Sequence, residues 1–157
     1  MANPAGVKRQ LMGVYDPAWA RSVAETLRGL GTQAAWVVHG GGMDELVLDG
    51  ENQVVALAAG GIQEFTLRAA DAGLAPAALA QLRGGDAAYN AQALLALLRG
   101  EKGAYRDTVA LNAAAALVVA GQAQTLPQGV ARAITAIDEG AALAVLERLK
   151  SVSGEQT

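Results

Sequence analysis

A short apolar run that ends in three glycines constrains this chain more than any other feature. Residues 34–38 read Ala-Ala-Trp-Val-Val, and Gly40, Gly41 and Gly42 follow His39. Residues 8–15 also have strand character, and a helical pattern lies between the two segments. A strand that is apolar on both faces is typical of a parallel sheet covered by helices on both sides. The sequence therefore predicts an α/β fold built on a β-α-β unit.

The helix between the two strands is marked at both ends. Asp16-Pro17 is typical of a helix start, with aspartate as the N-cap and proline at the first helical position. Gly31 suits the helix end. The apolar residues between them have helical spacing, at Trp19, Val23, Leu27 and Leu30.

An antiparallel hairpin and several helices are predicted after the glycines. Val54–Leu57 and Ile62–Leu67 flank Gly60-Gly61 and form the arms of a hairpin appended to the parallel sheet. From Asp71 onward we expect mainly helix. The helical segments follow Asp86, span Arg106–Ala120, begin at Leu126-Pro127 and span Ala141–Lys150. We expect one α/β domain over residues 1–157, with a flexible polar tail over 151–157.

The charge and composition exclude several classes of function. The net charge is −3, and the 12 basic residues are scattered, which argues against a nucleic-acid-binding surface. The absence of cysteine excludes disulfides and thiolate metal sites and fits a reducing cytoplasm. The most apolar run, Ala113–Ala120, is too short to span a bilayer. We therefore expect a cytoplasmic protein with no membrane or nucleic-acid partner.

The adjacent carboxylates Asp44 and Glu45 are the strongest candidates for chemistry. They follow the glycines after one residue, Met43, and Mg²⁺ commonly binds through one or two carboxylates together with substrate phosphates. Both acids can face one ion only if the backbone is irregular, because neighbouring side chains of a strand point to opposite faces. The residues alone do not distinguish two interpretations of the pair, a metal site and a solvated acidic turn. They also leave open whether Gly40–Gly42 approach a phosphate or form a tight turn without a ligand.

Other polar residues have simpler interpretations. His39, the only histidine, is expected to be an oriented, hydrogen-bonded residue rather than a general base. Asp86 after Gly84-Gly85 is expected to cap a helix. Asn112 lies in an apolar helix and needs backbone partners. Trp19 and Trp36 are expected in the core or at a domain interface.

Several ordered segments resemble one enzyme family. They are Asn3-Pro4-Ala5, Gly13-Val14-Tyr15-Asp16-Pro17, Val37-Val38-His39-Gly40, Gly42-Met43-Asp44-Glu45, Gly73-Leu74, Gly84-Gly85-Asp86 with Asn90, Gly100-Glu101-Lys102-Gly103, and Leu111-Asn112-Ala113-Ala114-Ala115-Ala116-Leu117. Their order and spacing resemble the C-terminal part of anthranilate phosphoribosyltransferase, and the resemblance covers essentially the whole chain after Ala2.

This resemblance implies a fold, a reaction and a cofactor. The fold would be the α/β domain shared by nucleoside phosphorylases and phosphoribosyltransferases. The reaction would transfer a phosphoribosyl group from phosphoribosyl pyrophosphate to anthranilate in tryptophan biosynthesis, releasing pyrophosphate. Asp44 and Glu45 match the family's Mg²⁺-binding pair, and Gly40, Gly41 and Gly42 would lie on the phosphate side. No catalytic residue is assigned, and the intact enzyme is expected to be a homodimer.

The resemblance also implies missing parts. Family members carry an N-terminal helical domain, a Gly-Thr-Gly-Gly-Asp phosphate loop, a Lys-His-Gly segment and an anthranilate-binding arginine, none of which has a counterpart in this sequence. We expect a C-terminal fragment that is inactive alone, that self-associates through uncovered apolar surface, and whose Lys8 and Arg9 face the missing half. The alternatives are a noncatalytic binding module of the same fold and a related nucleoside phosphorylase.

Overall fold

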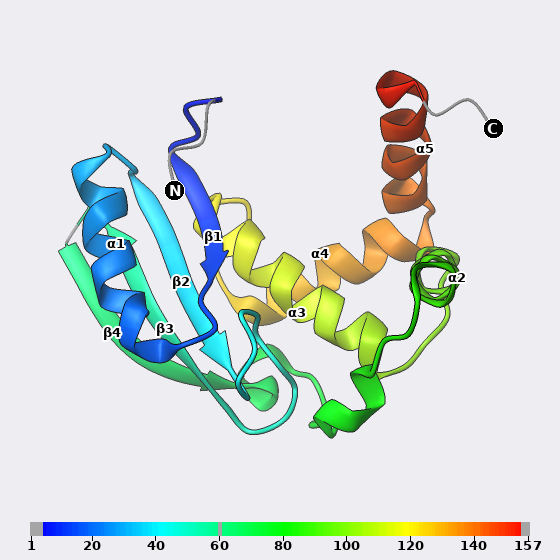
Figure 1. The fold of residues 1–157 in the computed structure, drawn as a ribbon, viewed down its shortest axis with the longest axis horizontal. Helices are drawn as coiled ribbons and strands as arrows, with labels where there is room; N and C mark the ends of the chain where they lie inside the picture. The colour runs from blue at the N-terminus through cyan, green and yellow to red at the C-terminus, as the bar shows by residue number, and fades with distance from the viewer. Residues whose placement is uncertain (1–4, 60, 155–157) are drawn as a thin grey trace.

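A four-stranded mixed sheet organises the chain (Figure 1). The computed structural model describes residues 5–59 and 61–154. The strands lie in the order β1 (Arg9–Gly13), β2 (Ala34–Gly40), β3 (Glu51–Ala58) and β4 (Gly61–Arg68). β1 and β2 are parallel, whereas β2–β3 and β3–β4 are antiparallel. The predicted parallel unit with an appended hairpin is therefore confirmed, although Gly60, predicted in the hairpin turn, lies outside the described residues.

Helices cover both faces of this sheet, as the apolar β2 strand predicts. α1 (Ala20–Gly29) packs on one face and α3 (Ala104–Val119) on the other (Figure 1). Alternate residues of a strand point to opposite faces. Val37 accordingly lies in the apolar cluster under α1, and Val38 lies in the cluster under α3.

The tryptophans occupy different environments. Trp36 packs against the core on the α3 side and meets Phe65 edge-on, with ring centroids 5.3 Å apart. Trp19 is 54% exposed, so it does not lie in the core of this chain, and its alternative place at a domain interface stays a prediction. A 3-10 turn, η1 (Pro17–Trp19), follows the Asp16 cap, and α1 begins only at Ala20. Trp19 therefore precedes the buried helical face instead of belonging to it.

The second half of the chain is mainly helical but starts later than expected. Two short 3-10 segments, η2 (Ala69–Ala72) and η3 (Leu79–Leu82), precede α2 (Ala87–Leu98). Gly73, at a φ of 74°, ends η2, and Pro76 disfavours helix in the residue before it. The prediction of helix from Asp71 onward therefore fails between residues 73 and 86, apart from η3.

The last helices extend to the end of the described chain. α4 (Leu126–Asp138) follows α3, and α5 (Ala141–Ser153) includes the first residues of the predicted tail. The tail over 151–157 is thus corrected at its start, because Ser153 donates to the Lys150 carbonyl and Gly154 ends the helix at a φ of 78°. Residues 155–157 lie outside the described part. Within the described residues, no helix is long and apolar enough to cross a membrane.

Helices α3 and α4 cross at very short range. A Cβ atom added at Gly129 of α4 would lie 2.8 Å from both the Cα and the Cβ of Ala114 in α3. Side chains in a close-packed interior leave no room for such an atom. The glycine therefore sets the separation of the two helices.

Replacing Gly129 by alanine should destabilise the chain. Alanine normally stabilises a helix by roughly 0.5–1 kcal/mol relative to glycine, but overpacking here should cost about 1–3 kcal/mol. We expect Gly129→Ala to lower the free energy of unfolding in urea, whereas Gly29→Ala in α1, with open space around the added atom, should not. Equal effects of the two substitutions would contradict the tight helix crossing.

Candidate functional site

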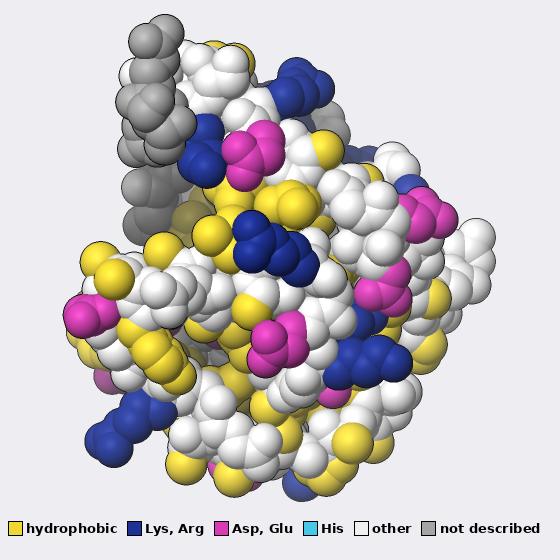
Figure 2. Space-filling view, turned by 90° about the vertical axis from the view of Figure 1, so that its right-hand side faces the viewer, with side chains coloured by type: hydrophobic (Ala, Val, Ile, Leu, Met, Phe, Trp, Pro, Cys, Tyr) yellow, Lys and Arg dark blue, Asp and Glu magenta, His cyan; other side chains and the backbone are white. Residues whose placement is uncertain are grey.

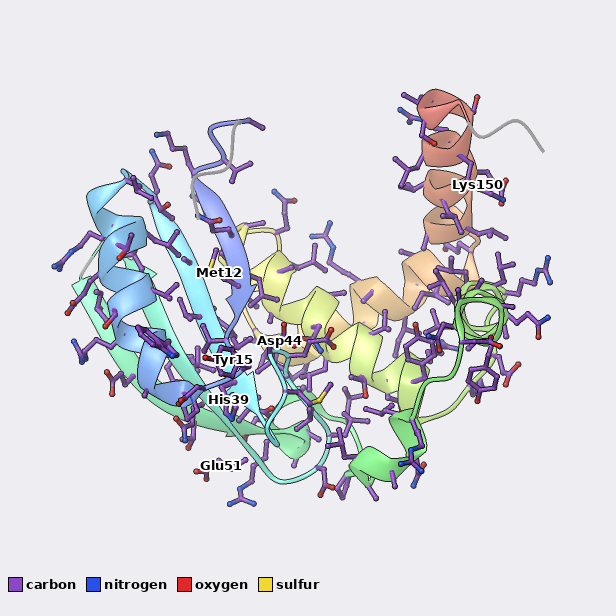
Figure 3. The ribbon with its side chains drawn as sticks, in the orientation of Figure 1. Met12, Tyr15, His39, Asp44, Glu51 and Lys150 are labelled. Carbon is purple, nitrogen blue, oxygen red and sulfur yellow. The ribbon has the colours of Figure 1, made fainter. Side chains whose placement is uncertain are left out.

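The carboxyl ends of the two parallel strands form the candidate site. β1 ends at Gly13 and β2 at Gly40, side by side in a parallel register. Figure 3 shows Tyr15, His39 and Asp44 near one another at this edge of the sheet. Ligands of open α/β sheets commonly bind outside the carboxyl ends of the strands. The structure therefore places the predicted acidic segment at the edge where a ligand is expected.

The glycines form a tight turn that leads out of β2. The amide of Met43 donates to the carbonyl of Gly40 over 2.8 Å, and the amide of Gly40 donates back to Met43 over 3.2 Å. Gly41 and Gly42 have φ values of 57° and 80°, which favour glycine. The tight-turn interpretation is therefore correct for the backbone, and Gly41 and Gly42 lie exposed at its tip.

Asp44 and Glu45 follow this turn on a bent, irregular backbone, and both are exposed. Neither carboxylate has a hydrogen bond or ion pair within the described residues. Their oxygens are ligands that Mg²⁺ prefers. No group of three or more His, Cys, Asp or Glu that could hold a metal occurs in the described part of the chain. The pair thus fits a metal that takes its remaining ligands from substrate and water, not one enclosed by protein.

Gly13 allows the acidic segment to lie against β1. A Cβ added at this position would stand 1.5 Å from the backbone carbonyl oxygen of Asp44. Any side chain at residue 13 would therefore displace Asp44. The close approach fixes the acidic pair relative to the parallel strands.

Two asparagines hold the chain just after the acidic pair. Asn112 of α3 bonds to the backbone of Leu46, and Asn52 of β3 bonds to the backbone of Val47. The expectation that Asn112 needs backbone partners is confirmed. Asn52, fully buried, was missed by sequence reasoning. No spacing in the sequence marks it, because its role depends on contacts with the buried backbone of Val47.

His39 and Arg9 are also tied to the backbone. The Nδ1 atom of His39 lies 2.9 Å from the carbonyl oxygen of Val14; because a carbonyl can only accept, Nδ1 carries the proton in this contact. His39 is thus oriented and hydrogen-bonded as predicted. Arg9 donates to the Val119 carbonyl at the end of α3 over 3.2 Å, so it faces this chain's own helix. Lys8 is exposed.

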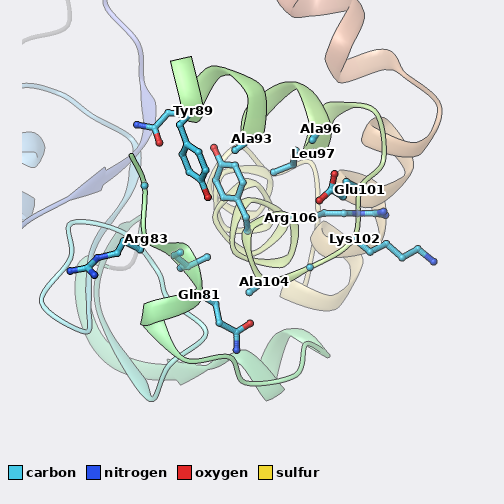
Figure 4. A pocket seen from close by; sticks show the side chains of 15 residues that line it. Gln81, Arg83, Tyr89, Ala93, Ala96, Leu97, Glu101, Lys102, Ala104 and Arg106 are labelled. Atoms are coloured by element: carbon cyan, nitrogen blue, oxygen red, sulfur yellow. The ribbon is translucent and has the colours of Figure 1, made fainter. Parts of the chain in front are cut away.

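A separate cavity of about 380 Å³ lies between the η3–α2 loop, α2 and the start of α3 (Figure 4). The matched segments Gly84–Asp86 with Asn90 and Gly100–Gly103 contribute to its walls. Asp86 caps α2 by accepting from the amide of Tyr89, as predicted. Arg106 lines the cavity, but its guanidinium is buried and paired with Asp138 at 2.9 Å. The acidic pair is not part of this cavity's lining.

Comparison with known proteins assigns the chain to a family. The family model described as "Glycosyl transferase family, a/b domain" matches residues 1–143. The chain belongs to this glycosyl transferase family. Its similar relatives in the family include the anthranilate phosphoribosyltransferase of Mesorhizobium japonicum, 56% identical over 98% of the chain, and that of Brucella canis, 49% identical over 99%. The sequence resemblance is therefore confirmed.

Solved structures of family members share the fold. The anthranilate phosphoribosyltransferase of Thermus thermophilus superposes with a TM-score of 0.85 and 43% identity over 93% of the chain. That of Saccharomyces cerevisiae in complex with PRPP and Mg has a TM-score of 0.79 over 88% of the chain and, at 23% identity, shows the fold alone. The chain spans 46% of the length of the curated relatives and 41–43% of these structures.

The acidic pair should contribute nothing to folding. Because neither carboxylate has a partner, we expect Asp44→Ala and Glu45→Ala to change the free energy of unfolding by less than about 0.5 kcal/mol. Asp138→Ala removes the partner of the buried Arg106 guanidinium and should cost about 2 kcal/mol. Urea denaturation of the three variants measures the difference. A loss of stability at residues 44 or 45 as large as that at 138 would show that the pair is structural.

Proposed function

We propose that this chain supplies the Mg²⁺-binding carboxylates of an enzyme that transfers a phosphoribosyl group from phosphoribosyl pyrophosphate to anthranilate, releasing pyrophosphate, in tryptophan biosynthesis. The observation that carries the proposal is the exposed, unpaired Asp44–Glu45 pair at the carboxyl edge of β1 and β2. The 56% identical relative from Mesorhizobium japonicum is named anthranilate phosphoribosyltransferase, which supports the reaction. Homologous yeast structures with PRPP and Mg and with 4-fluoroanthranilate support the ligands.

The charge of the leaving group explains the need for an acidic pair. Breaking the bond between the anomeric carbon and the diphosphate leaves a polyanion, and a bound Mg²⁺ supplies charge neutralisation for its oxygens. Two carboxylates are too few to saturate an octahedral ion, so phosphate oxygens and water would complete the ligand set. Asp44 and Glu45 would therefore hold the Mg²⁺ and orient it toward the diphosphate. The amine of anthranilate then needs mainly correct positioning.

The glycine turn contributes less to phosphate binding than its composition indicates. The amide of Gly40 is used within the turn, and Gly40 itself is buried. Gly41 and Gly42 are exposed at the tip next to the acidic pair, which supports a contact between their amides and a phosphate oxygen. We assign the phosphate-side role to these two residues.

The acidic pair should determine the Mg²⁺ dependence of catalysis. We expect a hybrid, in which this chain replaces the matching segment of the Mesorhizobium japonicum relative, to form phosphoribosylanthranilate with Mg²⁺. Asp44→Ala and Glu45→Ala should each lower its turnover roughly 100-fold and raise the Mg²⁺ concentration for half-maximal rate. Glu139→Ala, an exposed acid at the end of α4, should change neither value.

This chain without the remainder should be inactive in the same assay, because it has no counterpart of the family's phosphate loop. Product formed by the 157-residue chain alone would refute that expectation. Unchanged Mg²⁺ dependence in both acidic variants of the hybrid would refute the metal assignment.

An exposed apolar stripe on α5 supports self-association of the chain. Val145, Leu149 and Val152 are 64%, 62% and 83% exposed, and their spacing places them on one helix face. α5 projects from the rest of the fold in Figure 1, and Figure 2 shows hydrophobic side chains between charged ones on this side of the molecule. We propose that a second copy of the chain covers this stripe.

Sedimentation velocity should detect this association. We expect the average mass to rise with concentration for the unaltered chain, and to fall toward the monomer in the double variant Val145→Ser, Leu149→Ser. Leu30→Ser at the end of α1, where Leu30 is 54% exposed, should leave the association unchanged. A monomer at all concentrations would contradict the proposal.

A further inference from the structure

The backbone after the acidic pair is buried without being part of the sheet. Leu46, Val47 and Leu48 are 0%, 2% and 1% exposed, yet no strand includes them. A buried peptide group must find hydrogen-bond partners, and the ladder of a sheet is not available to these residues. For Leu46 and Val47, side chains supply the partners.

Asn112 satisfies the first of these residues completely. Its Oδ1 atom accepts from the amide of Leu46 over 3.0 Å, and its Nδ2 atom donates to the Leu46 carbonyl over 2.8 Å. The second Nδ2 hydrogen goes to the carbonyl of Thr108, one turn earlier in α3, over 3.0 Å. This last bond fixes the amide on its own helix, so α3 dictates where Leu46 lies.

Asn52 of β3 bonds to the backbone of the next residue, Val47, in the same way. Its Oδ1 atom accepts from the amide of Val47 over 2.7 Å, and its Nδ2 atom donates to the Val47 carbonyl over 2.9 Å and to the Leu67 carbonyl over 3.3 Å. A Cβ added at Gly40 would come within 2.0 Å of this Oδ1 atom. Gly40 therefore makes room for Asn52, which explains why the first glycine of the triplet is buried.

We infer that Asn52 and Asn112 are positioning residues for the acidic pair. They bond to the backbone amides and carbonyls of the two residues directly after Glu45, while the glycine turn holds the chain before Asp44. The bend that carries both carboxylates is thus fixed at each end by bonds to β2, β3 and α3. Asp44 and Glu45 would therefore hold a metal without a further ordering of the loop, because folding has already ordered it.

The inference rests on the proposed metal-binding function, and Mn²⁺ serves as a spectroscopic probe for it. We expect Mn²⁺ added to the full chain to broaden the backbone amide NMR signals of residues 43–46 through its unpaired electrons. Asn112→Ala should weaken this binding about tenfold, the lower end of the effect of removing a direct partner of a metal ligand, because Asn112 acts on Glu45 through the Leu46 backbone. It should also raise amide hydrogen exchange at Leu46.

Asn90 offers a matched control. Asn90 of α2 makes the same pair of bonds to Gly85, which precedes that helix. It accepts from the Gly85 amide over 2.9 Å and donates to the Gly85 carbonyl over 3.1 Å. Asn90→Ala should therefore raise exchange at Gly85 and leave Mn²⁺ binding unchanged. Asn112→Asp retains the acceptor for the Leu46 amide. Its Mn²⁺ affinity should lie between that of Asn112→Ala and that of the unaltered chain, and it replaces the alanine variant if that variant fails to fold.

The outcomes separate the two hypotheses. If Asn112→Ala frees the Leu46 amide but leaves the Mn²⁺ affinity intact, the asparagine is merely structural and the inference fails while the metal assignment stands. If Asp44→Ala and Glu45→Ala together leave the broadening unchanged, the metal assignment fails instead. Unchanged exchange at Leu46 in Asn112→Ala would refute the positioning contact itself.

Discussion

The structure depends on how a buried, non-strand segment obtains its hydrogen bonds. The side chains of Leu46 and Leu48 belong to the core on the α3 side, so this part of the chain cannot move out to solvent. Asn112 and Asn52 bond to the peptide groups of Leu46 and Val47, because an unpaired buried amide costs about 1–3 kcal/mol. The loop that carries the acidic pair is thereby attached to β3, which follows it closely in sequence, and to α3, whose Asn112 lies 66 residues from Leu46.

Close backbone contacts complete this arrangement. Gly13 lets the Asp44 carbonyl lie against β1, and Gly40 lets the Asn52 amide lie against β2. Neither position has a φ that requires glycine; the requirement is the space that a Cβ would fill. The turn residues Gly41 and Gly42 differ, because their positive φ values need glycine for conformational reasons. The triplet Gly40–Gly42 therefore contains glycines that are needed for two different physical reasons.

Local patterns predicted much of this fold, and contacts between distant residues account for what they missed. The apolar β2 run, the Asp16 cap and the Asp86 cap act through neighbours in sequence, so periodicity and capping rules identify them. The acidic pair is a candidate from the sequence for a similar reason, since it follows the glycines after one residue, Met43. Asn52 was missed because its importance depends on Val47 and Leu67. No spacing in the sequence indicates that the partner backbone is buried. Trp19 was expected on the buried helical face because propensity does not fix helix starts to one residue.

The small side chains of α3 explain how one helix can control the site. Alanines at positions 110, 114 and 115 are fully buried, and Ala114 lies close enough to Gly129 to exclude a single methyl group. Such packing leaves α3 little freedom to shift, because close-packed interiors resist displacement. Arg9 bonds to its carboxyl end and Arg106, paired with Asp138, fixes its amino-terminal turn. Asn112 lies between these anchors, so the helix presents its amide to Leu46 from a fixed position. The buried alanines of α3 therefore help to keep the acidic loop in a fixed position, in addition to favouring a helix.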